Sequence, residues 1–319
     1  MPITPNGTAW TKRTATLPGI GVTVFSCPDD VLATSATPTV LFFHGAGGLP
    51  GQLSELPAFV PMFAMLMDNG IAVIEGDPLP IIRTDTGASM SGQQWCNAQS
   101  RAAYPAFHQY WAALHPAART VEFLMGRSMG GLMALYLAAK HPDYAGAAVI
   151  SNSGVSSWFI GDNSPVVGSQ PPTDQRSTGR YFTPAVVNGA WGVTSFEELR
   201  EAVDEADVAP ESWNAEIFAG RSIAFQYGDA DRAVPWQTRG GAYVRNRWAP
   251  HLALDRVALQ PGGTHDGKDG TPTSYQQVDA VRDFILEVLG QEPPPPQPAT
   301  INRVVGRYTR IDGNLHRIL

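Results

Sequence analysis

A serine flanked by glycines stands where an apolar run gives way to a helix-forming run. Residues 121–125 (VEFLM) favour a strand, residues 126–131 (GRSMGG) follow, and residues 132–140 (LMALYLAAK) favour a helix. A serine on a sharp strand-to-helix turn projects its hydroxyl outward, and glycines remove the β-carbons that would clash there. This spacing indicates that Ser128 is a nucleophile. The alternative is that Ser128 only caps the helix in a glycine-rich connection.

Two later loops could supply the base and the acid that a serine nucleophile needs. His265 stands in a glycine-flanked loop (GGTHDG) and could take the proton of Ser128 and return it to the leaving group. Asp231, in the loop GDADRAVP, would hold the imidazole in the required tautomer, and Asp229 is the alternative acid. Asp231 could instead cap the next helix, and His265 could be a surface residue. The chain order serine, acid, histidine favours the triad.

A glycine-rich loop after an earlier strand could bind a developing negative charge. Residues 39–43 (TVLFF) form the apolar run of a strand buried on both faces, and they lead into residues 44–48 (HGAGG). Glycines let backbone N–H groups approach a ligand. A flexible turn is the alternative, and a phosphate loop is disfavoured because no Gly-Lys-Ser/Thr follows. We expect His44 to shape this loop and not to act as a base.

The elements that must position these residues alternate along the chain between strand and helix. Strands are expected at residues 21–27, 39–43, 71–75, 121–125, 146–151, 222–227 and 254–259. Helices are expected at residues 56–67, 93–114 with a break at Pro105, 132–140, 195–206, from about 236, and 275–289. This rhythm predicts βαβ units and therefore an α/β fold with a mostly parallel twisted sheet and helices on both faces.

The alternation fails between about residues 154 and 214, after the strand that ends near Ser151. An insertion at this point would lie over the carboxyl end of the sheet, so we interpret it as a cap that lines the substrate site; a peripheral decoration is the alternative. Its scattered aromatic residues favour packing in the cap's own core over stacking on sugars or lining an acyl pocket. They are Trp158, Phe159, Tyr181, Phe182 and Trp191.

The carboxyl-terminal part differs from the rest of the chain. Residues 291–298 (QEPPPPQP) predict a stiff linker that ends a domain of residues 1–290. Beyond it, Asp312-Gly313 between apolar-containing runs predicts a hairpin within residues 299–319. An isolated hairpin is marginally stable, so we expect this basic tail to serve attachment or self-assembly; a frayed end is the alternative.

Composition excludes several classes of function. A formal net charge of −7 argues against a general nucleic-acid binder. The 2 cysteines, Cys27 and Cys96, provide neither a disulfide framework nor metal-ligand spacing, so we expect no metal and no cofactor. We find no apolar stretch long enough to span a membrane and no amino-terminal apolar segment of a secretory signal. The expectation is a cytoplasmic or virion-associated protein.

Taken together, the motifs HGAGG (44–48), GRSMGG (126–131), HPD (141–143), the loop through Asp231 and GTHD (263–266) resemble the α/β-hydrolase superfamily. More narrowly, they are similar to its esterases of the feruloyl-esterase and polyhydroxybutyrate-depolymerase type. The resemblance covers about residues 14–290.

This resemblance implies oxyanion donors at the N–H groups of Met129 and Ala46, with Gly45 as second choice. It also implies a serine esterase that acts through an acyl-enzyme intermediate on a small-molecule or cell-envelope ester. A serine peptidase of the same fold is one alternative. The other is a structural or adhesion protein with a hydrolase fold, because such an appended tail is similar to enzymatic tail proteins of actinobacterial phages.

Overall fold

Eight strands of the chain form one sheet, in the order β1-β2-β4-β3-β7-β8-β9-β10. The computed structural model describes residues 2–34, 36–46, 48–78, 82–83, 89–90, 95–158, 189–231, 233–234, 236, 241–265, 272–274, 277–292, 308–311 and 314–317. The strands of the sheet are β1 (Trp10–Leu17), β2 (Gly21–Pro28), β3 (Thr39–Phe43), β4 (Ala72–Pro78), β7 (Phe123–Arg127), β8 (Ala148–Asn152), β9 (Ser222–Gly228) and β10 (Leu254–Gln260). β2 pairs antiparallel with both β1 and β4, and the six strands from β4 to β10 are parallel.

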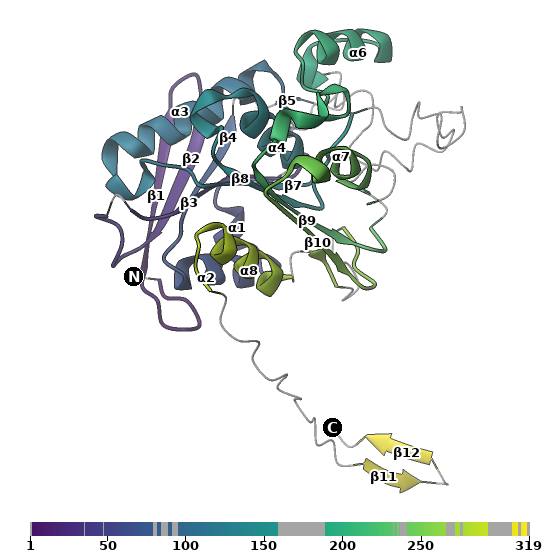
Figure 1. Cartoon of the computed structure of the whole chain (residues 1–319). Coiled ribbons are helices and arrows are strands. Elements are labelled where there is room, and N and C mark those ends of the chain that lie inside the picture. Colours follow the sequence, from purple (N-terminus) through teal and green to yellow (C-terminus); the bar gives the residue numbers. More distant parts are fainter. Residues whose placement is uncertain are drawn as a thin grey trace.

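Helices cover both faces of this sheet (Figure 1). They are α1 (Gln52–Glu55), α2 (Val60–Asp68), α3 (Ala98–Leu114), α4 (Gly130–Lys140), α6 (Phe196–Glu205), α7 (Gly241–Trp248) and α8 (Val278–Val288). One apolar core joins the sheet to α3, α4 and α7, and a second core joins its other face to α1, α2 and α8. The predicted α/β-hydrolase fold class is therefore confirmed.

The predicted elements largely agree with the structure, and β3 has the predicted bounds. The predicted break at Pro105 is wrong, because α3 continues through this residue. A proline inside a helix costs about 3 kcal/mol, and the burial of Tyr104, Phe107 and Trp111 against the sheet offsets that cost. The predicted helix at residues 56–67 corresponds to α2, which begins at Val60, and the short helix α1 precedes the predicted range.

The edge strand β1 was not predicted from the sequence. Its middle carries Lys12, which is half-buried, and the exposed residues Arg13 and Thr14, and only Trp10 and Leu17 at its ends are buried. A strand with charged side chains at its centre gives little apolar alternation, and edge strands commonly carry such charges because they discourage pairing with other chains.

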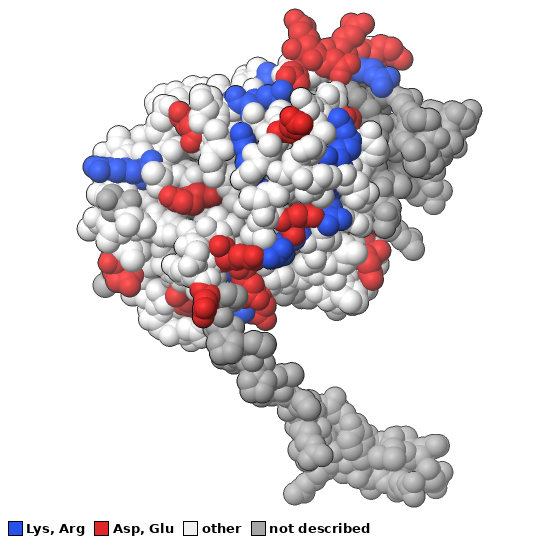
Figure 2. Space-filling view, in the orientation of Figure 1, with Lys and Arg blue, Asp and Glu red and all other residues white. Residues whose placement is uncertain are grey.

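Only part of the predicted cap insertion lies within the described residues. Residues 159–188, which include Phe159, Tyr181 and Phe182, lie outside them. The described part contains α6, which begins with a capping box in which Ser195 and Glu198 bond to each other's backbone N–H groups. Acidic side chains gather over α6 in the space-filling view (Figure 2). The role of this insertion as a cap stays a prediction.

Four short strands form two further, two-stranded sheets. β5 (Ile82–Arg83) pairs with β6 (Ser89–Met90), and β11 (Tyr308–Ile311) pairs antiparallel with β12 (Asn314–Arg317). The predicted turn residues Asp312-Gly313 and most of the proline-rich linker lie outside the described residues. The division of the chain into a main domain, a linker and an attachment tail stays a prediction.

Candidate active site

Ser128 occupies a sharp turn between β7 and α4. Its φ of +49° lies in the left-handed region, which non-glycine residues rarely adopt. Three backbone hydrogen bonds hold it there: its N–H donates to Asn152 O at 3.2 Å, and its carbonyl accepts from Gly131 N at 2.9 Å and Val155 N at 2.7 Å. A strained conformation persists where the surroundings determine it fully, which is a common property of functional sites.

Glycines allow the strand and helix backbones to approach each other at this turn. A β-carbon added to Gly126 would lie 2.4 Å from the carbonyl oxygen of Gly130, and one added to Gly130 would lie 2.2 Å from Phe43 O. Both distances are far below van der Waals contact. The crowding predicted from the Gly-x-Ser-x-Gly spacing is therefore confirmed, and it brings α4 against the end of β3.

The structure brings Ser128, His265 and Asp231 together from three separate loops. His265 Nε2 lies 3.0 Å from Ser128 Oγ, and His265 Nδ1 lies 2.8 Å from Asp231 Oδ2. A carboxylate only accepts, so Nδ1 carries a proton and the neutral ring leaves Nε2 to accept from the serine hydroxyl. All three residues are at least 94% buried. This arrangement can transfer a proton from the hydroxyl to the imidazole.

The two candidate acids have different partners. Asp231 uses its second oxygen, Oδ1, to accept the N–H groups of Ala233 and Val234, each at 2.9 Å. Asp229 is exposed and accepts Gly262 N at 2.6 Å through Oδ1. Asp231 therefore supports the histidine, whereas Asp229 ties the acid-bearing loop to the histidine-bearing loop.

The glycine-rich loop after β3 lies directly beside Ser128. A β-carbon added to Gly45 would lie 3.1 Å from Ser128 Cβ. The Gly45 carbonyl accepts from His44 Nδ1 and from Gly48 N, each at 2.9 Å. Because the N–H and C=O of a trans peptide point in opposite directions, these two bonds fix where the Ala46 N–H points. Gly47 lies outside the described residues.

The candidate oxyanion donors have no internal acceptor in the part of the chain that the structure describes. No hydrogen bond there uses the N–H of Ala46 or of Met129. Met129 precedes the first residue of α4, so its N–H also lies at the positive end of the helix dipole. Both groups are thus available to a negatively charged oxygen.

A buried polar network behind the triad was missed in the sequence. Ser274 Oγ donates to Asn152 Oδ1 at 2.7 Å and contacts Ser153 Oγ at 2.8 Å, and Asn152 Nδ2 donates to Gln226 Oε1 at 3.1 Å. Asn152 also accepts the Ser128 N–H, so the network connects the nucleophile's turn to the segment that follows His265. Its signal in the sequence is faint: polar residues end the apolar runs of β8 and β9.

A cluster of three indoles joins the described part of the insertion to the region beside Met129. The rings of Trp158 and Trp191 meet edge to face with centroids 5.8 Å apart, and Trp95 lies 6.4 Å from Trp158. Trp191 Nε1 donates to Trp95 O at 3.1 Å, and Trp95 N donates to Met129 Sδ at 3.3 Å. Trp95 and Trp158 belong to the same apolar core as the sheet, and Trp191 packs against it, so the described aromatic residues of the insertion join the main core and do not form the separate core that the sequence favoured.

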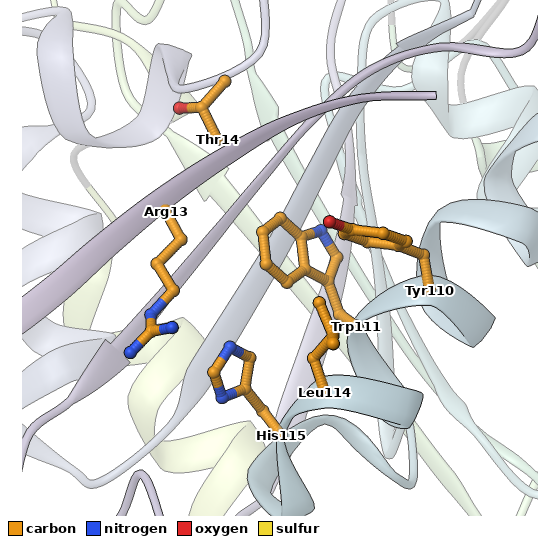
Figure 3. A pocket seen from close by; sticks show the side chains of 6 residues that line it. All are labelled: Arg13, Thr14, Tyr110, Trp111, Leu114 and His115. Carbon is orange, nitrogen blue, oxygen red and sulfur yellow. The ribbon is translucent and has the colours of Figure 1, made fainter. Parts of the chain in front are cut away.

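A separate surface hollow of about 480 Å³ lies between β1 and α3. Arg13 and Thr14 of β1 line one side of it, and Tyr110, Trp111 and Leu114 of α3 line the other (Figure 3). None of the residues predicted to do chemistry borders this hollow. Within the described ranges, no group of three or more His, Cys, Asp or Glu residues could hold a metal ion, and no helix is suited to cross a membrane.

One protein-family model matches just under half of the chain. The model of the family described as "Putative esterase" matches residues 109–266, which contain Ser128, Asp231 and His265. No curated protein sequence matches the chain.

Solved structures share the fold at low sequence identity. An acylaminoacyl peptidase of Pyrococcus horikoshii is 13% identical with a TM-score of 0.57, covering 89% of this chain and 42% of the peptidase. An esterase of Pseudomonas putida is 17% identical with a TM-score of 0.53, over 88% of this chain and 81% of the esterase. Est1E of Butyrivibrio proteoclasticus is 16% identical with a TM-score of 0.51, over 88% of this chain and 99% of Est1E. This chain therefore spans about two fifths of the peptidase's length but nearly all of Est1E.

Proposed function

The chain is an α/β-hydrolase of the esterase type, and on this premise we propose that it cleaves carboxylic esters through an acyl-enzyme intermediate formed on Ser128. The observation that carries this proposal is the continuous chain of hydrogen bonds from Ser128 Oγ through His265 to Asp231. In this proposal the substrate is a small-molecule or cell-envelope ester.

Acylation begins when His265 Nε2 takes the hydroxyl proton while Ser128 Oγ attacks the ester carbonyl carbon. Asp231 accepts the Nδ1–H and stabilises the imidazolium that forms. The tetrahedral intermediate then collapses, the bond to the alcohol oxygen breaks, and the leaving alcohol takes the proton from Nε2. Water repeats the sequence on the acyl-enzyme, releasing the acid and restoring the serine hydroxyl.

The negative oxygen of each tetrahedral intermediate is stabilised by backbone N–H groups. Met129 and Ala46 are the proposed donors, and Gly45 is the second choice for the loop donor. Preorganised donors of this kind act in a site from which water is excluded, and the loss of one typically costs about 10²–10³ in turnover. The hydrogen bonds that hold the Gly45 carbonyl support this preorganisation.

An ester is proposed as the substrate in preference to a peptide. The matched family model is that of esterases, and the chain covers 42% of the acylaminoacyl peptidase. Hydrolysis of p-nitrophenyl esters should exceed that of the matching p-nitroanilides by a large factor. Faster cleavage of the anilides would reverse this assignment in favour of the peptidase.

The direct test is the activity of Ser128→Ala on p-nitrophenyl acyl esters, together with labelling by a fluorophosphonate. The parent protein should turn over and take up one label, and the variant should do neither. Ser212→Ala provides a matched control, because Ser212 caps a local turn through a bond to Ala209 O and lies far along the chain from the triad. Equal hydrolysis by the parent and Ser128→Ala would refute the nucleophile assignment.

We also propose that residues 299–319 attach the hydrolase domain to a protein partner or to further copies of the chain. The antiparallel pairing of β11 with β12 and the arginines of this segment support an attachment role. Truncation after Leu289 should leave ester hydrolysis unchanged and abolish assembly or partner recovery. If the full chain neither self-assembles nor recovers a partner, the attachment role is wrong. The alternative of a structural or adhesion protein is then wrong as well.

A further inference from the structure

The proposed oxyanion loop packs against the short helix α1. A β-carbon added to Gly48 would lie 2.5 Å from Gln52 Oε1 and 2.7 Å from His44 Cβ, so Gly48 fits between these two side chains. Gln52 is the first residue of α1. Because Gly48 N donates to the Gly45 carbonyl, a displacement of α1 would be transmitted to the Gly45–Ala46 peptide.

Glu75 of β4 is buried against α1. It is 1% exposed, and its Oε1 accepts the N–H of Leu53, the second residue of α1, at 3.1 Å. Its other oxygen, Oε2, is buried without a hydrogen-bond partner among the described residues. Oε1 can accept from Leu53 N–H in either charge state, whereas an ionised carboxylate with a buried, unpaired Oε2 carries a large desolvation cost that the protonated form avoids.

Two further orphaned polar atoms lie around the same loop. Gln52 Oε1 and His44 Nε2 are also buried without a hydrogen-bond partner in the described part of the chain, and His44 Nε2 lies 3.6 Å from Asp77 Oδ1. His44 Nδ1 donates to the Gly45 carbonyl, so Nε2 of the neutral ring is an acceptor. An amide oxygen is an acceptor as well. Among these atoms, a protonated Glu75 carboxyl is the group that can donate.

We propose that Glu75 is a positioning residue for the oxyanion loop, and that its proton holds α1, and through Gly48 the Gly45–Ala46 peptide, in the reactive arrangement. This inference rests on the proposed function, because it matters only if the Ala46 N–H stabilises an oxyanion. Glu75 itself does not touch the substrate. Its ionised form loses the donor and places a charge in an apolar layer, so the loop donor is misplaced.

The surroundings of Glu75 keep its proton up to neutral pH. Burial raises the pKa of Glu75 from 4.5 to about 7, against the lowering effects of the Leu53 N–H and of Lys12. The titratable and charged groups around it come from several elements: Lys12 of β1, Glu55 of α1, His44 after β3, Asp77 of β4 and Tyr104 of α3. The loop should therefore lose its support as the pH rises past about 7.

The test compares the pH profile of kcat for a p-nitrophenyl ester in the parent and in Glu75→Gln. The amide keeps the shape, the acceptor for Leu53 N–H and a donor, and it does not titrate. The kcat of the parent should fall by about tenfold between roughly pH 7 and 9. This is less than the factor of about 10²–10³ that complete loss of one oxyanion donor costs, because the loop donor is displaced and not removed. Glu75→Gln should show no such fall, with KM unchanged in both proteins.

Glu55→Gln is the matched control, because Glu55 is an exposed acid on the same helix that pairs with Lys12. It should keep an alkaline fall of the same size, displaced toward lower pH, because the charge of Glu55 helps to raise the pKa of Glu75. Glu75→Met, which has a similar volume and no hydrogen-bonding carboxyl, should lower kcat by about tenfold at pH 6 with KM unchanged. Circular dichroism at the assay temperature would establish that this variant is folded.

The inference is overturned if Glu75→Gln keeps the alkaline fall of the parent or if folded Glu75→Met turns over as fast as the parent. Its failure is distinct from failure of the proposed function. An active Ser128→Ala variant would refute the esterase mechanism itself. An inactive Ser128→Ala variant, combined with an unaltered pH profile in Glu75→Gln, would refute only the role of Glu75.

Discussion

Replacing Asp231 by asparagine should abolish most of the activity without disturbing the fold, because the structure dictates how the new amide will lie. In the parent, Oδ1 accepts two backbone N–H groups, from Ala233 and Val234, and Oδ2 faces His265 Nδ1. In Asp231→Asn the carbonyl oxygen must take the place of Oδ1, since an NH₂ group there would face two donors. The NH₂ group is thereby directed at His265 Nδ1.

The consequence is the wrong histidine tautomer. An NH₂ donor stabilises the ring with an unprotonated Nδ1, so the proton moves to Nε2 and His265 can no longer accept from Ser128. A change of this kind in a serine–histidine–aspartate triad lowers kcat by about 10⁴, or about 5 kcal/mol in the activation free energy. KM should change little, because Asp231 is buried behind the histidine.

The assay is steady-state hydrolysis of a p-nitrophenyl ester, with Asp229→Asn as the matched control. Asp229 is a carboxylate two residues away in the same loop, and it binds Gly262 N instead of the histidine. Its replacement should cost less than about tenfold, since an amide oxygen can still accept that single hydrogen bond. Full inactivation by Asp229→Asn with substantial activity in Asp231→Asn would refute the assignment of the triad acid.

Three further predictions concern stability. Gly130→Ala should lower the free energy of unfolding by about 1–3 kcal/mol, because its β-carbon would lie 2.2 Å from Phe43 O and overpack the turn. Urea unfolding that matches the parent would show that the turn is not as tightly packed as this distance requires. Ser128→Gly should be more stable than Ser128→Ala by about 1 kcal/mol, because the backbone φ at residue 128 is +49°, which glycine adopts without strain. Thermal unfolding of both variants measures the difference, and equal stability would argue against backbone strain at this residue. Burial raises the pKa of Glu75 from 4.5 to about 7, so the contribution of its protonated form to stability is fully present below about pH 4.5 and is lost as the pH rises to about 7. Over that interval the free energy of unfolding should fall by about 3 kcal/mol in the parent and should not fall in Glu75→Gln. Urea unfolding at several pH values measures this, and the same pH dependence in both proteins would refute it.

Residue types at fixed offsets predicted most of the fold, because each constraint is local. The run TVLFF has no polar face, which is a property of central parallel strands, and the glycines around Ser128 reflect a clash that sequence spacing alone reveals. Pro105 shows where local rules fail. Its cost to the helix is local, whereas the burial that compensates for it arises from the sheet underneath and is invisible in sequence.

The same distinction applies to the candidate site. Ser128, His265 and Asp231 could be proposed from chain order, although spacing alone left Asp229 open. The hydrogen bonds that separate the two acids, to Ala233 and Val234 in one case and to Gly262 in the other, are tertiary. The polar network around Asn152 and the buried carboxyl of Glu75 depend on segments that meet only after folding. An acid within the apolar run IAVIE was the sole local hint of Glu75.

The loops that carry the acid and the histidine are fastened to each other at several points. Asp229 N donates to Gln260 O at 3.1 Å, Ala230 N donates to Gly263 O at 3.0 Å, and Asp229 Oδ1 receives Gly262 N at 2.6 Å. These three bonds hold the acid-bearing loop directly against the histidine-bearing loop. A substitution that moves both loops together would change the position of the imidazole relative to Ser128 and leave its bond to Asp231 in place.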